Sequence, residues 1–394
     1  MKYLLIAIVA TLLLTKCNTD IDLTAPYEDI TVVYGLLDQS SDIQYIRINK
    51  SFLGDVALQD MAAIRDSVEY DDTDILSARV EKLDGSSIVD FWELKDTLVE
   101  AINETLFYVE GITDPLRKVY YFEEANLDQD FDYRLNIKFS NKDSVFCTTS
   151  LISNTPGAIT NPQSNSAGNS SQRISFFNSP NADGLRLPKN YQFRWKSEVG
   201  AKRYALFIEM DYVEKVWESP AFENEISSEV KTLEWYMGET NTTNVAQDGT
   251  MSENLEKAIN GELFTQEIAS QLESNPNITR EIGLLNEAIT PGHYSAFRFK
   301  LVSADEDYNS FIDFAEPSTS LAQERPQWTN VTNGQGLFSS RLNQQSTDIR
   351  MDIQTMNELC SGGVTSDLNF CWKGASVLNC DIDPDLCTCF YLCE

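Results

Sequence analysis

Cysteine is the residue whose number and spacing in this chain could most directly support chemistry. Six of the eight cysteines fall within the last 35 residues. Thiols gathered in this way can hold a metal ion, form disulfide bonds or provide a reactive nucleophile. Spacing alone does not choose among these roles, so the compartment of the protein has to be considered first. The six are Cys360, Cys371, Cys380, Cys387, Cys389 and Cys393.

The first residues predict export. The chain begins MKYLLIAIVATLLLTKCNTD, in which one lysine precedes a run from Tyr3 to Leu14 that is apolar apart from Thr11. This run is too short for a bilayer-spanning helix, which needs about 20 residues, and it fits the central region of a secretory signal. We therefore expect a signal peptide over residues 1–16.

The end of this run resembles the lipobox of bacterial lipoproteins, because Leu14 stands three places before Cys17. In such proteins the signal is removed before the cysteine, which then carries acyl chains. Lys16 departs from the small residue usual before the cut, and an ordinary signal with an incidental cysteine is the alternative. The resemblance implies lipidation at Cys17, a membrane anchor without a spanning helix, and a tether over residues 17–28.

Export bears on the role of the tail cysteines, because an oxidising compartment favours disulfides. A zinc site needs two pairs of cysteines two to four residues apart, and the tail offers that range only from Cys389 to Cys393. A segment of 35 residues buries too little surface to fold without a covalent cross-link. A short disulfide contributes about 3 kcal/mol to the free energy of unfolding. We expect a disulfide-bonded, cysteine-rich tail over 346–394, with zinc or reduced thiols as alternatives.

The charge balance excludes one class of partner. The chain carries 61 Asp and Glu residues against 30 Lys and Arg residues, a net charge of −31. Such a chain repels nucleic acid, so we expect no nucleic-acid partner. The acids are spread along the chain, and solubility accounts for them without a specific role.

Alternating apolar residues predict strands from Asp29 onward. In YRLNIKF, residues Tyr133, Leu135, Ile137 and Phe139 occupy every second position, which places them on one face of a strand. Similar runs include ITVVYGLLD, IQYIRI, SARVEKLD and IVDFWEL. They predict an N-terminal β-sandwich domain over 29–153, with Cys147 as a small buried residue.

A polar segment separates this region from the next. Within NTPGAITNPQSNSAGNSSQR, twelve of twenty residues are Asn, Ser, Gly or Pro. Few apolar groups are present to offset the entropy of ordering, so we expect a linker or long loop over 154–184.

The second region, 185–345, opens with YQFRWKSEVGAKRYALFIEMDY. Trp195 on one predicted strand, followed on the next by Tyr204 and alternating aliphatic residues, resembles strands B and C of fibronectin type III domains. Thr250-Met-Ser-Glu then offers a capping box. Apolar residues follow at helical spacing, which predicts a helical insertion at about 250–275, interrupted near Asn260. These residues are Leu255, Ile259, Leu263, Ile268 and Leu272.

Catalytic motifs are scarce. The one histidine, His293, lies in the turn-like sequence TPGHY, and neither a nucleophile elbow nor a phosphate-binding glycine loop occurs. We expect no enzyme activity and no cofactor. With 61 acids, however, some carboxylate pair will always lie close, so a hydrolase using two carboxylates stays open.

One acidic segment has the spacing of a calcium-binding loop. Against calcium, Ser310 replaces the glycine needed for the sharp turn, and a predicted strand and Pro317 flank the segment in place of helices. We expect a polar turn, and calcium binding is the alternative. The oxygen-bearing residues at loop positions 1, 3, 5, 9 and 12 are Asp305, Asp307, Asn309, Asp313 and Glu316.

Two stretches carry a more specific resemblance, and they are APYEDITVVYGLLDQSSDIQYIRINKSFLG and EPSTSLAQERPQWTNVTNGQGLFSSR. They resemble the opening and closing segments of a Bacteroidota lipoprotein family of unassigned function, often encoded beside TonB-dependent outer-membrane receptors. The resemblance spans roughly Cys17 to Arg341 and leaves out the tail. It implies a cell-envelope location at the outer membrane, with a TonB-dependent receptor as a candidate partner, and it supplies no catalytic residues.

The sequence therefore predicts a mainly β protein with two β-sandwich domains and a cysteine-rich tail. The predicted function is that of a non-catalytic, lipid-anchored accessory or binding module beside an outer-membrane transporter or secretion assembly. A surface hydrolase of glycan or peptide is the alternative. Near the end of the second region, Gly336 would let a short strand or loop pack closely on the preceding sandwich.

Overall fold

The computed structural model describes residues 29–51, 68–100, 116–154, 156–163, 173–242, 253–283, 297–315 and 328–373. The predicted signal peptide, the lipidation site Cys17 and the tether lie outside these residues. No helix in the described part of the chain has the length and apolar character needed to cross a bilayer.

The described chain is mainly β, as predicted. The strands are β1 (Thr31–Asp38), β2 (Ile43–Lys50), β3 (Ile75–Asp84), β4 (Ser87–Glu93), β5 (Lys95–Glu100), β6 (Leu116–Glu123), β7 (Asp132–Phe139), β8 (Val145–Ser150), β9 (Ile159–Asn161), β10 (Arg173–Ile174), β11 (Asn190–Lys196), β12 (Ala201–Trp217), β13 (Glu225–Asn241), β14 (Asn254–Asn260), β15 (Ile278–Gly283), β16 (Phe297–Asp305), β17 (Gly334–Met351) and β18 (Phe370–Lys373). The helices are α4 (Gly261–Gln271), α5 (Glu306–Ala315), α6 (Ile353–Ser361) and a 3-10 turn at Ser366–Leu368.

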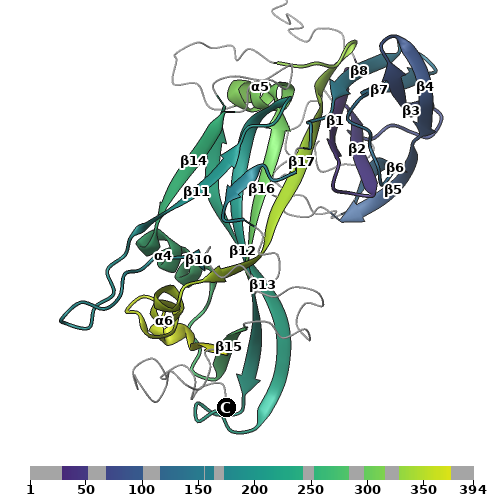
Figure 1. Ribbon diagram of the computed structural model, residues 1–394. Coiled ribbons are helices and arrows are strands. Elements are labelled where there is room, and N and C mark those ends of the chain that lie inside the picture. Colours follow the sequence, from purple (N-terminus) through teal and green to yellow (C-terminus); the bar gives the residue numbers. More distant parts are fainter. Residues whose placement is uncertain are drawn as a thin grey trace, which may run out of the picture.

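These strands form three sheets. An eleven-stranded sheet has the main order β18-β15-β12-β16-β17-β1-β2-β6-β5, with β10 beside β17 and β13 beside β12. A four-stranded sheet (β4-β3-β7-β8) packs near one end of it and a three-stranded sheet (β14-β11-β9) near the other. The large sheet therefore contributes one layer to each of two sandwiches (Figure 1).

The first sandwich is built from the predicted alternating strands. In β7 the residues Tyr133, Leu135, Ile137 and Phe139 are all buried, and they face side chains from β1 and β2. Cys147 on β8 is buried in the same core as a free thiol, and burial raises its pKa. This core also includes Val33, Leu37, Ile46, Ile48, Val80, Phe122, Val145 and Phe338.

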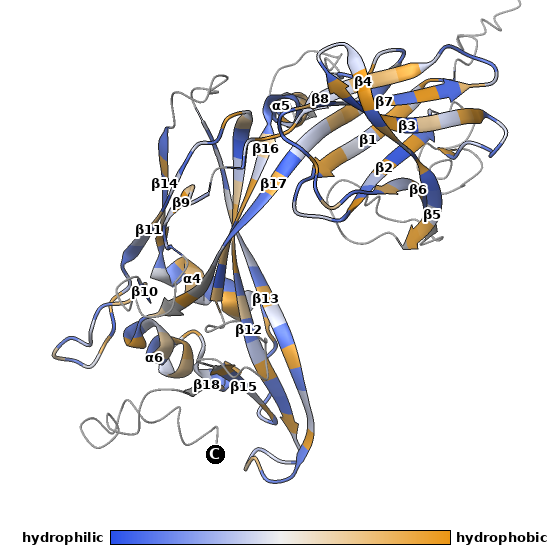
Figure 2. Cartoon of the chain, turned by 45° about the vertical axis from the view of Figure 1, so that its right-hand side comes forward, coloured by the Kyte–Doolittle hydropathy of each residue, from blue (hydrophilic) through white to orange (hydrophobic). Residues whose placement is uncertain are grey.

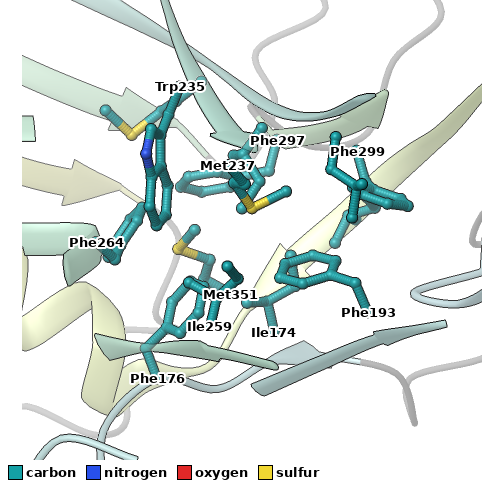
Figure 3. Packing of buried hydrophobic residues seen from close by; sticks show 14 of the residues in the cluster. Ile174, Phe176, Phe193, Trp235, Met237, Ile259, Phe264, Phe297, Phe299 and Met351 are labelled. Carbon is teal, nitrogen blue, oxygen red and sulfur yellow. The ribbon is translucent and has the colours of Figure 1, made fainter. Parts of the chain in front are cut away.

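The second sandwich has the larger core, and it includes both strands expected from Trp195 and Tyr204. Their rings lie on β11 and β12, with centroids 5.8 Å apart. Figure 3 shows how aromatic and sulfur-containing side chains from several elements meet in this core. Among them are Trp235 and Met237 of β13, Phe264 of α4, Phe297 and Phe299 of β16 and Met351 of β17.

The predicted helical insertion is half wrong. Residues 254–260 form strand β14, which pairs with β11, and only 261–271 form a helix. Leu255 and Ile259 are four residues apart, a spacing that shares one face in a strand as well as in a helix. The side chain of Asn260 accepts a hydrogen bond from the Glu262 N–H and caps α4, so the helix begins at the predicted interruption.

The segment expected as a linker also contributes to the second sandwich. Within 154–184, β9 pairs with β11 and β10 pairs with β17. Ile159, Ile174 and Phe176 are buried in the second core. Most residues of this segment are polar, but it also contains short apolar runs, and those runs pack in the second core.

Strand β17 joins the two sandwiches. Its first half pairs in parallel with β1, from Gly334 opposite Thr31 to Arg341 opposite Asp38. Its second half pairs antiparallel with β16, from Arg341 opposite Ala304 to Ile349 opposite Phe297. Phe338 lies in the first core, whereas Leu342 and Ile349 lie in the second. The two sandwiches thus share one continuous strand.

Polar contacts at this crossing hold the shared strand in place. The carboxylate of Asp305, at the end of β16, accepts hydrogen bonds from the Thr149 hydroxyl of β8 (3.1 Å) and the Ser340 N–H (3.2 Å). It also accepts one from the Ser339 hydroxyl and one from the Tyr308 N–H. Burial raises the pKa of Asp305, and these hydrogen bonds oppose that effect.

Close approach at the β1–β17 contact requires glycine. Gly336 has φ +106, a conformation that residues with a Cβ rarely adopt, and a Cβ there would lie 1.9 Å from the Val33 carbonyl oxygen. The strand could then keep its parallel register only if the backbone moved.

We expect Gly336→Ala to lower the free energy of unfolding by about 3 kcal/mol or more, because backbone strain and a backbone clash add together. Gly85→Ala is the matched control: Gly85 also has positive φ (+59), but open space surrounds its Cβ position. The control should cost only about 1–2 kcal/mol, the cost of the left-handed conformation. Urea unfolding of both variants measures the difference, and equal losses would contradict the close contact.

Candidate binding surface

The tail cysteines within the described residues belong to the second sandwich. Cys360 on α6 and Cys371 on β18 are buried in its core and are disulfide-bonded. Met356, Leu359 and Phe370 are buried beside them. Part of the segment expected as a separate tail is therefore integral to the fold. Cys380, Cys387, Cys389 and Cys393 lie outside the described residues, as does His293, and disulfides at those four cysteines stay a prediction.

The calcium-like segment forms a helix, which corrects the expected turn. Asp305 ends β16 and α5 begins at the next residue, where the Asp305 carboxylate accepts the Tyr308 N–H at 2.9 Å as a cap does. Asn309 and Asp313 then lie one helical turn apart and share Arg203, whose Nε and Nη2 donate to them at 3.0 and 2.6 Å.

These oxygen atoms are therefore engaged by a guanidinium and do not face a common metal position. Glu316 falls outside the described residues. Nowhere in the described ranges do three or more His, Cys, Asp or Glu side chains gather as metal ligands would.

Several carboxylates in the described chain contact arginine. Glu214 accepts a hydrogen bond from Arg280 at 3.2 Å, and Glu209 accepts one from Arg298 at 2.8 Å. Loss of one partner from such a pair would leave an unpaired charge where water is partly excluded, so the pairs tie together the strands that carry them. Asp38, Glu81 and Asp211 have arginine partners as well.

A different feature suggests function, which is a group of exposed apolar side chains at the outer edge of the first sandwich. On β4, Ile88, Val89 and Phe91 are 45%, 52% and 50% exposed, and Leu76 on the neighbouring β3 is 68% exposed. Figure 2 shows hydrophobic residues along β4 on the side of the sandwich away from the second core. We call these four residues the β4 surface.

The position of β4 in its sheet explains this exposure. Among the described strands, β4 pairs with β3 alone and is the last strand of the four-stranded sheet. Its inward-facing Trp92 stacks on Phe122 and Tyr133 of the first core, at centroid distances of 5.4 and 6.2 Å. Phe91 therefore points to the opposite face. A register shift between Lys82 and Leu83 places an extra residue in β4.

A cluster of charged side chains centred on Glu81 lies beside Phe91. The Glu81 carboxylate accepts hydrogen bonds from Nε of Arg79 and of Arg134, each at 2.7 Å, and from the Asn136 amide at 3.3 Å. The guanidinium of Arg79 also lies 5.2 Å from the centre of the Phe91 ring, which is cation–π distance. Arg79 is thereby held next to the exposed ring.

The charge state of Glu81 follows from this cluster. Burial acts to raise its pKa, but the hydrogen bonds and charges of Arg134 and Arg79 outweigh burial and hold the pKa below its usual value. Glu81 is thus an ionised structural group. The β4 surface places exposed apolar side chains beside arginines that are paired with Glu81, which suits contact with another macromolecule.

Sequence reasoning predicted the strand IVDFWEL and missed its exposure. A signal was present, because Ile88-Val89 and Phe91-Trp92 are adjacent apolar pairs and break strict alternation. A strand with one buried face can bury only one member of each pair. In the structure Trp92 packs on the core and Phe91 is left exposed, and both members of the Ile88-Val89 pair are exposed.

Comparison with protein-family models gives no match, and comparison with curated proteins gives none.

Glu81→Gln should lower the free energy of unfolding at pH 7 by about 1–3 kcal/mol, because the charge-assisted hydrogen bonds to both arginines weaken. The glutamate pKa is lowered by folding, so its stabilisation is present above the usual glutamate pKa and is lost as pH falls through the folded-state value. Urea unfolding from pH 7 downward should therefore show wild type and variant converging at acid pH.

The control is Glu93→Gln, an exposed carboxylate on the neighbouring strand. It should change stability by less than about 0.5 kcal/mol at pH 7. A loss that is the same for both variants, or that does not shrink in acid, would count against the ion cluster.

Proposed function

We propose that this chain is a non-catalytic, lipid-anchored protein of the cell envelope that binds a partner through the β4 surface. The partner we propose is an outer-membrane transporter, with a TonB-dependent receptor as the leading candidate, or a secretion assembly. The resemblance to the Bacteroidota lipoprotein family and the lipobox-like Leu14-to-Cys17 motif support the location. We also propose that the second sandwich is a fibronectin type III-like domain.

The observation that carries this proposal is the row of half-exposed apolar residues on β4. Soluble proteins seldom leave a contiguous apolar strip uncovered, and strips of this kind commonly mark interaction sites. Ile88, Val89 and Phe91 fall on one short strand, so a partner could contact all three at once. Arg79 and Arg134, which are paired with Glu81, add polar groups at the margin of the apolar contact.

The lipid anchor gives the first test. Wild-type protein expressed with its signal should partition into the detergent phase, and Cys17→Ala should remain in the aqueous phase, because acyl chains supply the membrane affinity. Mass spectrometry of the mature N-terminus identifies the acylated cysteine. Equal partitioning of the two forms into detergent would contradict lipidation at Cys17.

The docking surface gives the second test. We expect Val89→Ser/Phe91→Ser to reduce recovery of the partner from solubilised outer membranes by at least about tenfold, because the central apolar contacts of an interface carry most of its affinity. The matched control is Leu185→Ser/Leu187→Ser, which alters two residues that are 60% and 53% exposed elsewhere on the surface.

Mass spectrometry of the recovered proteins should identify a transporter or a secretion component with wild type and with the control. Binding through apolar contacts should persist at raised salt. Equal recovery with both double variants would reject the β4 surface. If the protein hydrolyses a glycan or peptide, and one carboxylate substitution abolishes that activity, the protein is a hydrolase and the proposal is rejected.

A further inference from the structure

A second surface lies at the other end of the molecule, on the long hairpin of β12 and β13. Each strand has 17 residues, and the distal part extends beyond the second core, away from the first sandwich (Figure 1). On β13 the core-facing residues Leu233 and Trp235 are buried, whereas residues 225–230 are all exposed. We call residues 211–234 the arm.

One side of the arm is an open sheet edge. Within the described residues β13 pairs with β12 alone. The Glu234 carbonyl accepts a hydrogen bond from the Gln271 side chain of α4 at 3.1 Å, so the backbone of Glu234 points away from β12. Because backbone groups alternate in direction along an antiparallel strand, those of Ser228, Val230 and Thr232 point the same way.

These three residues present main-chain N–H and C=O groups to the open side. In the register with β12, no irregularity interrupts the run from Ser227 to Tyr236. The edge of β4, by contrast, contains a register shift, and bulges of this kind discourage strand addition. The arm therefore offers the longer regular edge for pairing with another chain.

Charge on the arm is strongly negative. It contains seven carboxylates and two lysines, a net charge of −5. Arg280 and Arg298 neutralise Glu214 and Asp211 from neighbouring strands. Lys231 Nζ lies 2.6 Å from the Glu214 carboxylate and 3.9 Å from that of Glu229, whose side chain is 74% exposed. Natural edge strands are often protected by lysine; on β13 the most exposed charge is the Glu229 carboxylate, and Lys231 is paired with Glu214.

The side chains beside the edge alternate in chemistry. Val230 is 47% exposed on one face, and Glu229 projects from the other. A strand added to this edge would place alternate residues against Val230 and Glu229 in turn. Apolar β-branched or aromatic residues fit the first face, and Lys or Arg fits the second.

We propose that the edge of β13 from Ser228 to Thr232 binds an extended segment of a partner protein by strand addition. The segment carries Lys or Arg at alternate positions, with β-branched or aromatic residues between them. Pairing with a second copy is disfavoured, because two arms of charge −5 on chains of charge −31 would repel each other. The proposal concerns a different surface and binding mode from the β4 surface, and either can fail without the other.

The test uses the full chain and a fluorescent nine-residue peptide of alternating Lys and Val, with binding followed by anisotropy at low and raised salt. We expect saturable binding that weakens as salt rises, because charge attraction contributes to it. The same peptide N-methylated at alternate residues keeps its charge but loses the edge hydrogen bonds, and it should bind at least about tenfold more weakly. A peptide of alternating Glu and Val should not bind.

Variants of the arm locate the site. Ser228→Pro removes an outward N–H at an edge position where proline is tolerated, and it should weaken binding at least about tenfold. Ser228→Ala keeps the N–H and should bind as wild type does. Glu229→Lys should weaken the Lys/Val peptide several-fold and permit binding of the Glu/Val peptide, and as an exposed substitution it tests the site independently of Ser228→Pro.

Several results would overturn the proposal. They are no binding of the Lys/Val peptide at low salt, equal binding of its N-methylated form, and unchanged affinity in Glu229→Lys. Unchanged affinity in a folded Ser228→Pro variant would do the same. A dimer of wild type at low salt that Ser228→Pro abolishes would assign the edge to a second copy of the chain.

Discussion

The structure depends on β17, a single strand whose side chains pack in the cores of both sandwiches. Along β17 the partner changes from parallel β1 to antiparallel β16 within a few residues, and the buried side chains change from the first core to the second. Gly336 permits the close parallel contact, and Asp305 gathers hydrogen bonds where the partners change. In the large sheet, β17 lies between β16 and β1 and so links the part that belongs to the second sandwich with the part that belongs to the first.

Residues with structural roles and surfaces open to partners lie in different parts of this fold. The residues that looked most reactive in the sequence have structural roles where they are described, since Cys360 and Cys371 are disulfide-bonded and buried in the second core, and Asn309 and Asp313 hold Arg203. The surfaces left for partners lie on edge strands far from β17. One is an apolar strip on β4, and the other is the acidic edge of the arm, so the two should differ in salt dependence.

Local patterns predicted much of the fold, and long-range pairing lay beyond them. Alternation in YRLNIKF predicted β7 and its buried face, and the apolar pairs in IVDFWEL already contained the signal for an exposed strand. Spacing could not assign Leu255 and Ile259, because a four-residue interval fits strand and helix alike. The parallel pairing of Thr31 with Gly334 joins distant parts of the chain, and no local property of either residue specifies it.

Native-state hydrogen exchange in low urea tests the shared strand most directly. If β17 couples the sandwiches, core amides of β1 and β7 in the first sandwich and of β12 and β16 in the second should exchange through one global opening. They would then have the same free energy and the same urea dependence. The account is contradicted if the β1 and β7 amides open at a lower free energy, with a smaller urea dependence, while β12 and β16 stay protected.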